Sequence, residues 1–304
     1  METLKNAYII TGPTCSGKTN LAIQLAKKIN GQIICMDSMT LYRCMDVGTA
    51  KPTNAERGSV PHHALDVLDP NQSSNVSSWL KLAKDSLNKI ISDKSVPIFV
   101  GGTPMYLKAL VYGIFESPPI EPSIRKALED RFSPSNTPEA HKYLEQVDPE
   151  SASRIHMNDL RRILRALEVF ESTKKKLSEF QIQWKKSSEE KINCVYIQLD
   201  RKILYDRIHK RTLILLENGW IQETKNLLEK YPDLGKEARQ AIGYQEIIRY
   251  LNGGISYEKM IDSINLRTRH LSKKQETWFR HLNFCSPWAP NSNPDLWGIP
   301  VQWQ

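Results

Sequence analysis

The sequence has few cysteines and pairs none of them in a metal-binding or disulfide spacing. Its five cysteines form no CxxC motif, and this excludes the usual zinc ribbons and disulfide scaffolds. No apolar run approaches the length of a membrane span. The first apolar run follows directly on residues 1–6, which leaves no room for a signal peptide. We therefore expect a cytoplasmic protein with no membrane segment, and a monomer.

The composition is that of a globular protein. The 304 residues are 40% hydrophobic and 25% charged, and this length suits one large domain or two smaller ones. The net charge of +8 is moderate. Such a charge suits a nucleic-acid partner, but many proteins of similar charge bind none.

One glycine-rich segment lies between an apolar run at 7–10 and a helical pattern at 21–26. It consists of Gly12, Pro13, Thr14, Cys15, Ser16, Gly17, Lys18 and Thr19. Strand, turn and helix in this order are the context of a P-loop, whose backbone N–H groups and helix N-terminus favour a polyanion. Lys18 would add a mobile cation, and the Thr19 hydroxyl would ligate Mg²⁺. The alternative is a chance match in a surface loop, and the motif does not indicate which bond breaks.

Two further apolar runs end in candidate site residues. Residues 33–36 predict a strand with Asp37 at its carboxyl end, where ligands bind in open α/β sheets. Asp37 would then lie over the phosphate loop, or it would only cap its own turn. The strand predicted at 96–100 ends in Gly101-Gly102-Thr103, where P-loop NTPases usually carry an acid. This departure argues against an NTPase, and the glycines allow close approach of a ligand.

Three other polar residues leave alternatives open. Lys51 is either a second phosphate cation or a solvated side chain. His62 and His63 are adjacent in sequence and point in different directions, so we expect them to pack or cap rather than share a metal.

The sequence changes character in its middle third. Residues 116–191 are charged and helical in pattern, and β character returns at 195–200. We therefore predict a P-loop α/β core with a mainly parallel sheet from residues 1–115 and 192–304, and a helical insertion domain at 116–191. The tail from Ser286 is rich in Pro, Asn and Trp, and we expect it to be irregular.

Basic helices are predicted in both parts. In the amphipathic segment 159–170, Arg161 and Arg165 share a face with Arg162 beside them. They would contact phosphates or form a solvated face. The segment 267–280 would be a nucleic-acid face with stacking aromatics, or a helix docked by its aromatic side chains.

Taken together, these segments resemble the tRNA dimethylallyltransferase family, also called tRNA isopentenyltransferases. The resemblance extends through most of the chain. It differs from the family pattern at Thr40, where glutamine is usual, and at Pro104. The matching segments are 12–19, 37–39, 42–43, 48–52, 62–63, 101–103, 106–107, 154–156, 158–159, 161–168, 241–244, 274–275 and 278–280.

The resemblance implies transfer of a dimethylallyl group from its diphosphate to N6 of the tRNA adenosine on the 3′ side of the anticodon. Asp37 would be the general base and Thr103 would lie near the bridging oxygen, while Arg211 would reach the diphosphate, with Arg207 as the second choice. The implied partners are dimethylallyl diphosphate, Mg²⁺ and a tRNA anticodon stem-loop. The implied tRNA contacts are Asp37, Ser38, Met39, Thr40, Thr103, Arg125, Arg161, Arg162, Ile163, Leu164 and Arg165.

Three other functions use the same features. A small-molecule or nucleoside kinase would consume ATP, and whether ATP also binds this loop is open. A regulatory P-loop NTPase would hydrolyse nucleotide slowly without RNA. A non-catalytic RNA-binding module would ignore the isoprenoid diphosphate.

Overall fold

The computed structural model describes residues 4–114, 121–180, 192–290 and 295–302, and it divides into two compact units. Unit 1 comprises Met1–Val111 and Glu189–Gln304, and unit 2 comprises Tyr112–Ser188. The predicted insertion at 116–191 differs from this division by a few residues at each end. Both predicted boundaries, at residues 116 and 191, lie outside the described residues.

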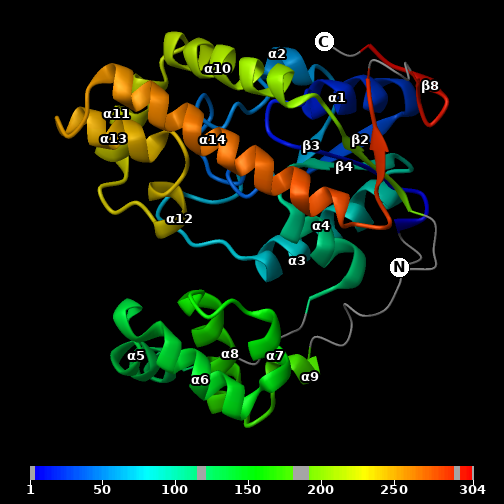
Figure 1. Cartoon of the computed structure of the whole chain (residues 1–304). Helices are drawn as coiled ribbons and strands as arrows, with labels where there is room; N and C mark the ends of the chain where they lie inside the picture. The colour runs from blue at the N-terminus through cyan, green and yellow to red at the C-terminus, as the bar shows by residue number, and fades with distance from the viewer. Residues whose placement is uncertain (1–3, 115–120, 181–191, 291–294, 303–304) are drawn as a thin grey trace. The chain divides into compact units, whose positions relative to one another are not determined.

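Unit 1 is built on a six-stranded sheet in which every neighbouring pair is parallel (Figure 1). Its strand order is β3-β2-β4-β1-β5-β6. The prediction of an α/β fold with a mainly parallel sheet is confirmed. The strands are β1 (Tyr8–Thr11), β2 (Gly31–Cys35), β3 (His62–His63), β4 (Val96–Gly101), β5 (Asn193–Ile197) and β6 (Ser286–Trp288).

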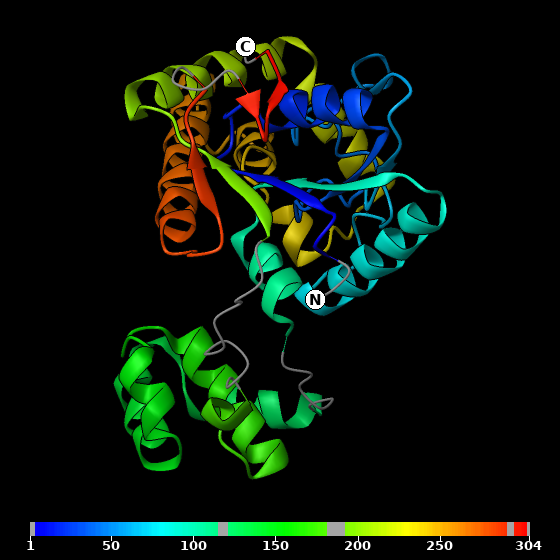
Figure 2. The same cartoon turned by 90° about the vertical axis from the view of Figure 1, so that its right-hand side faces the viewer.

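Helices cover both faces of this sheet. Helix α1 (Lys18–Ile29) and helix α3 (Val76–Ser92) pack on opposite faces, as Figure 2 shows. Strands covered on both faces become nearly continuous apolar runs, and Ile9 and Ile10 are accordingly fully buried. This burial is why the central strands could be predicted from the sequence.

Local signals fix where these helices begin. Gly17 precedes α1 with a φ of 86°, a left-handed conformation that glycine adopts at little cost. Asn75 precedes α3 and accepts a hydrogen bond from the Ser78 N–H at 2.9 Å. Such a cap satisfies a donor that the first helical turn leaves unpaired.

Side chains of α10, α11, α12, α13 and α14 form a second apolar core of unit 1, in which Trp220, Tyr244 and Ile264 are buried. The last helix is longer than the predicted 267–280, because its apolar face extends back to Met260. These helices are α10 (Arg201–Glu217), α11 (Trp220–Lys230), α12 (Lys236–Arg239), α13 (Tyr244–Leu251) and α14 (Tyr257–Arg280), and unit 1 also contains α2 (Asn54–Arg57) and α4 (Pro104–Tyr112).

The prediction of an irregular tail is wrong. Residues Ser286–Trp288 form β6, which pairs with β5 at the sheet edge. Proline is tolerated there because an edge strand has one unpaired side. Trp288 is buried and its Nε1 donates to the Asp295 carbonyl at 3.0 Å, and the short antiparallel pair β7 (Asp295–Leu296) and β8 (Ile299–Pro300) follows.

Unit 2 contains only helices among its described residues. Its core is formed by apolar side chains of α5, α6 and α8, including Leu128, Leu144 and Leu167. Helix α8 begins after Asp159, whose side chain accepts the Arg162 N–H at 3.2 Å. The elements are α5 (Pro122–Arg131), the 3₁₀ turn η2 (Pro134–Asn136), α6 (Thr137–Val147), α7 (Pro149–Arg154), α8 (Leu160–Thr173) and α9 (Leu177–Phe180).

Candidate active site

A pocket of about 280 Å³ lies at the carboxyl ends of the central strands of unit 1. The turns after β1, β2 and β4 form one side of it. This is the edge at which open parallel sheets bind ligands. Several predicted site residues line it together, namely Thr14, Cys15, Lys18, Asp37, Ser38, Met39, Thr103 and Arg211.

The predicted phosphate loop joins β1 to α1, as the motif requires. Lys18, the first residue of α1, extends its Nζ back to the Pro13 carbonyl at 3.1 Å. Arg211 approaches the loop from α10, and its Nη1 lies 3.6 Å from the Cys15 sulfur. Arg211 lines the pocket, whereas its sequence neighbour Arg207 is not one of the lining residues. Two cations therefore face the same concavity.

The environment of Lys18 favours its neutral form more than water does. Burial lowers the pKa of Lys18 to about 8, with the nearby Arg211 charge acting in the same direction. The Asp37 charge opposes this shift. A bound anion would stabilise the protonated amine, so the site is suited to a polyanion.

Asp37 both caps its own turn and lines the pocket, which are the two positions that the sequence left open. Its Oδ1 accepts the Met39 N–H at 2.9 Å, which is an Asx turn. The same residue lines the pocket together with Thr14, Cys15 and Lys18 of the phosphate loop. The turn fixes the orientation of the carboxylate, so capping and a role in the site are compatible.

The turn after β4 packs closely against the turn after β2. A Cβ on Gly101 would lie 1.9 Å from the Met36 carbonyl oxygen, so no side chain fits at the position where NTPases carry an acid. Thr103 follows, and its Oγ1 accepts the Ser38 N–H at 3.3 Å. The turns that carry Asp37 and Thr103 are therefore directly bonded to each other.

The structure gives a local account of both departures from the family pattern. Thr40 donates from Oγ1 to the Asp37 carbonyl at 3.3 Å, within the turn that presents Asp37. Pro104 is the first residue of α4, a position where its fixed φ suits a helix and its missing N–H has no intrahelical acceptor. Neither residue disturbs the turn that it occupies.

The other wall of the pocket was not predicted from the sequence. This wall is largely apolar and comes from segments remote in sequence. Its residues include Leu215, Trp220, Ile242, Tyr244, Ile264 and Leu271.

Trp220 is the largest side chain of this wall. Its indole lies against two glycines, where a Cβ on Gly48 or Gly243 would come within 1.9 Å or 1.8 Å of the ring. Glu223 holds the Gly48 loop by accepting the Gly48 N–H at 3.0 Å and the Tyr244 hydroxyl at 2.6 Å. The matching segments at 48–52 and 241–244 were a sequence signal for this wall, but gave no role to its members.

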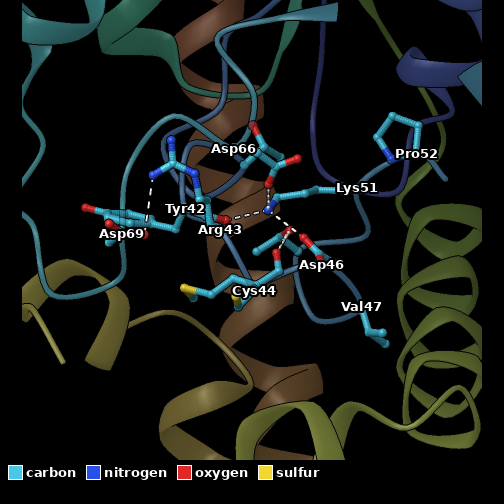
Figure 3. A network of polar contacts seen from close by, with 12 residues as sticks. Tyr42, Arg43, Cys44, Asp46, Val47, Lys51, Pro52, Asp66 and Asp69 are labelled. Atoms are coloured by element: carbon cyan, nitrogen blue, oxygen red, sulfur yellow. Dashed lines mark hydrogen bonds and ion pairs between the residues drawn. The ribbon is translucent and has the colours of Figure 1, made fainter. Parts of the chain in front are cut away.

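Both interpretations of Lys51 are wrong. Its side chain is 2% exposed and does not line the pocket. Figure 3 shows its ammonium group between the Asp46 and Asp66 carboxylates and the Tyr42 carbonyl. The Nζ–Oδ1 distance to Asp46 is 2.7 Å. Lys51 thus stabilises the loop that carries Gly48, because a buried cation must be paired.

The two adjacent histidines take packing positions in β3, as expected. His62 Nδ1 lies 2.9 Å from the Val60 carbonyl oxygen, and His63 Nε2 lies 2.7 Å from Gln32 Oε1. Burial lowers the pKa of both imidazoles. No group of three or more His, Cys, Asp or Glu side chains suited to a metal occurs in the described parts of the chain.

Unit 2 presents the four predicted tRNA-contacting arginines on its surface. Two of them converge on Glu168, a carboxylate that is 2% exposed. Arg125 Nη1 lies 2.9 Å from Glu168 Oε1, and Arg165 Nη1 lies 3.1 Å from Glu168 Oε2. Arg162 pairs with Asp159 at 3.3 Å.

The two apolar residues predicted beside these arginines are placed differently. Ile163 and Leu164 are 0% and 5% exposed and belong to the core of unit 2. In an amphipathic helix, the residues between exposed arginines turn toward the core. Their side chains do not reach the surface, and tRNA contact at these two positions stays a prediction.

A phosphate loop at the end of β1, two cations and a facing carboxylate define a P-loop α/β enzyme. Among the residues that the structure describes, no helix is both long and apolar enough to cross a membrane. Comparison with known proteins identifies the family. The IPP transferase family model matches residues 40–282, and the isopentenyl transferase model matches residues 5–66.

Relatives match over nearly the whole chain. A tRNA dimethylallyltransferase of Alkaliphilus oremlandii is 40% identical over 292 residues, covering 96% of this chain and 93% of the relative. One from Thermotoga neapolitana is 40% identical over 274 residues, covering 90% and 88%. This chain belongs to the tRNA dimethylallyltransferase (IPP transferase) family.

Solved structures agree with this assignment. The tRNA isopentenylpyrophosphate transferase of Bacillus halodurans has a TM-score of 0.69 and 33% identity, covering 94% of this chain and 90% of that one. A eukaryotic dimethylallyltransferase acting on tRNA has a TM-score of 0.73 and 30% identity, covering 90% and 69%. The P-loop-type fold and the family are therefore shown by both sequence and structure.

Proposed function

We propose that this enzyme transfers a dimethylallyl group from dimethylallyl diphosphate to N6 of the tRNA adenosine on the 3′ side of the anticodon. The observation that carries the proposal is the pocket itself. Lys18 and Arg211 face a concavity that Asp37 also lines. Cations suited to a diphosphate and a carboxylate suited to a proton thus share one site.

Each of these groups has a separate role in the reaction. The carbon–oxygen bond of the donor breaks as the carbon–nitrogen bond to N6 forms. Lys18, Arg211 and the loop N–H groups stabilise the charge that develops on the departing diphosphate. Asp37 accepts the proton that N6 loses, and Thr103, bonded to the Asp37 turn, lies near the bridging oxygen.

The apolar wall suits the hydrocarbon part of the donor. Trp220, Ile242 and Ile264 are close enough to line the same pocket as the cations. An apolar group placed there leaves water and contributes favourably in proportion to its buried area. The pocket therefore offers a polar side for the diphosphate and an apolar side for the dimethylallyl group.

We propose that a magnesium ion binds together with the diphosphate at the phosphate loop. Thr19, in the first turn of α1, would supply one hydroxyl oxygen, and Mg²⁺ is usually held by few protein ligands together with phosphate oxygens and water. The ion would help to neutralise the diphosphate. Its protein ligand would be Thr19.

Unit 2 and the turn after β2 are the proposed tRNA-binding parts. Arg125, Arg161, Arg162 and Arg165 would contact phosphates of the anticodon stem. The adenine would leave its loop stack to reach Asp37, as base-modifying enzymes require. We further propose a monomer that acts in the cytoplasm.

A kinase is the alternative that the P-loop allows, and one incubation separates the two. The protein is incubated with dimethylallyl diphosphate, Mg²⁺ and unmodified tRNA, and the digested nucleosides are analysed by mass. We expect adenosine carrying a dimethylallyl group together with released diphosphate. A phosphorylated product formed from ATP, with no prenylated nucleoside, would favour the kinase.

A further inference from the structure

Gln275 is a buried amide on α14 that bonds two separate turns of the pocket. The residue is only 6% exposed. Its Oε1 accepts the Thr14 N–H at 2.9 Å, and its Nε2 donates to the Gly102 carbonyl at 2.6 Å. One side chain thus joins the phosphate loop to the turn after β4.

The space around this amide is closely filled. A Cβ on Gly102 would lie 2.6 Å from Gln275 Nε2 and 3.5 Å from Lys18 Cε. The glycine therefore allows the amide, the lysine stem and the β4 turn to meet. A side chain at this glycine would push them apart.

The connection continues to the proposed general base. Thr103 follows Gly102, and its hydroxyl accepts the Ser38 N–H at 3.3 Å. Ser38 follows Asp37 in the turn after β2. Three hydrogen bonds therefore connect the phosphate loop, through Gln275 and the turn after β4, to the turn that holds the carboxylate.

The chemistry of this connection requires an amide of this length. Gln275 accepts at one end and donates at the other, which a carboxylate cannot do. A glutamate would place a negative charge opposite the Gly102 carbonyl and beside the proposed diphosphate site. A methionine would keep the length but would make neither hydrogen bond.

We infer that Gln275 is a positioning residue that fixes the separation between the phosphate loop and the turn carrying Asp37. This inference rests on the proposed function, since it assigns the loop to the diphosphate and the turn to the adenine. Holding these groups together aligns the reacting carbon with N6. Displacements of about 1 Å between reacting groups can lower a rate by about a hundredfold.

The test compares Gln275→Met with the wild type and with Thr277→Ala, a matched control on the exposed side of α14. Turnover is measured with both substrates saturating, and tRNA affinity is measured separately. Gln275→Met is expected to lower kcat by about ten- to a hundredfold, with tRNA Kd changed less than about twofold. Gln275→Glu should in addition raise the KM for the donor. Thr277→Ala should match the wild type.

Gly102→Ala should break the same connection, because its Cβ would push the Gln275 amide away. This variant replaces Gln275→Met in the test if Gln275→Met folds poorly. Combined with Gln275→Met it should cost little more than either change alone, because both remove one shared contact. Wild-type kcat in Gln275→Met, or a loss of tRNA affinity as large as the loss of kcat, would overturn the inference. The inference would also be overturned if the double variant lost kcat by the product of the two single losses. Failure of the wild type itself to prenylate tRNA would instead refute the proposed function.

Discussion

The Arg211 guanidinium on α10 lies 3.6 Å from the Cys15 sulfur in the phosphate loop. The two residues come from the two separate chain segments of unit 1, and the second segment thus completes the cationic side of the pocket. Arg211 lines the pocket, so its guanidinium can contact an anion held by the loop. Its charge should matter for the donor and not for the RNA.

Replacing Arg211 with methionine tests this relationship. Loss of a charged hydrogen-bond donor should raise the KM for dimethylallyl diphosphate by about ten- to a hundredfold. The tRNA Kd should stay within about twofold of wild type. Lys210→Met is the matched control, since Lys210 is exposed and pairs with Asp206 at 2.8 Å. Equal effects of the two substitutions would place Arg211 outside the donor site.

The pH dependence of donor binding should report Lys18. Its pKa is lowered to about 8 by burial, so the free enzyme loses this cation as pH rises through that value. The KM for the donor should be flat below about pH 7 and then increase up to about tenfold per pH unit above pH 8. Lys18→Ala should have a higher KM with no such rise. A rise of the same size in Lys18→Ala would assign the titration to another group.

Glu168 should couple Arg125 and Arg165 in RNA binding. Both guanidiniums pair with its buried carboxylate, so removing one arginine leaves the carboxylate to hold the other more tightly. Arg125→Gln and Arg165→Gln should each raise the tRNA Kd. The product of these two fold-changes should exceed the fold-change measured for the double variant. In a Glu168→Gln background they should become independent. Independence already in the wild-type background would contradict the coupling.

The parts of the molecule differed in how far the sequence predicted them. The central strands are apolar runs because both sheet faces are covered, and the P-loop is a contiguous motif, so both were predictable. The three-residue strand β6 is too short to show a period. Its place depends on pairing with β5.

The site was predictable only where its residues follow strands. Asp37 and Thr103 end apolar runs, and their meeting follows from a parallel sheet. Trp220 and Gln275 enter the pocket from helices far along the chain. Nothing in the sequence marks Trp220, and the matching segment at 274–275 gave Gln275 no role. Lys51 was misinterpreted because its burial depends on Asp46 and Asp66, whose approach is a tertiary feature.

The central claim is that Asp37 removes the N6 proton while the phosphate loop holds the departing diphosphate. The most direct measurement is the single-turnover rate of Asp37→Asn, with enzyme in excess over tRNA, dimethylallyl diphosphate saturating, and tRNA affinity determined in parallel. The amide keeps the shape and an acceptor for the Met39 N–H, but it is a very weak base. We expect the rate to fall by about two to four orders of magnitude, with tRNA affinity retained. A near wild-type rate in Asp37→Asn would contradict the claim.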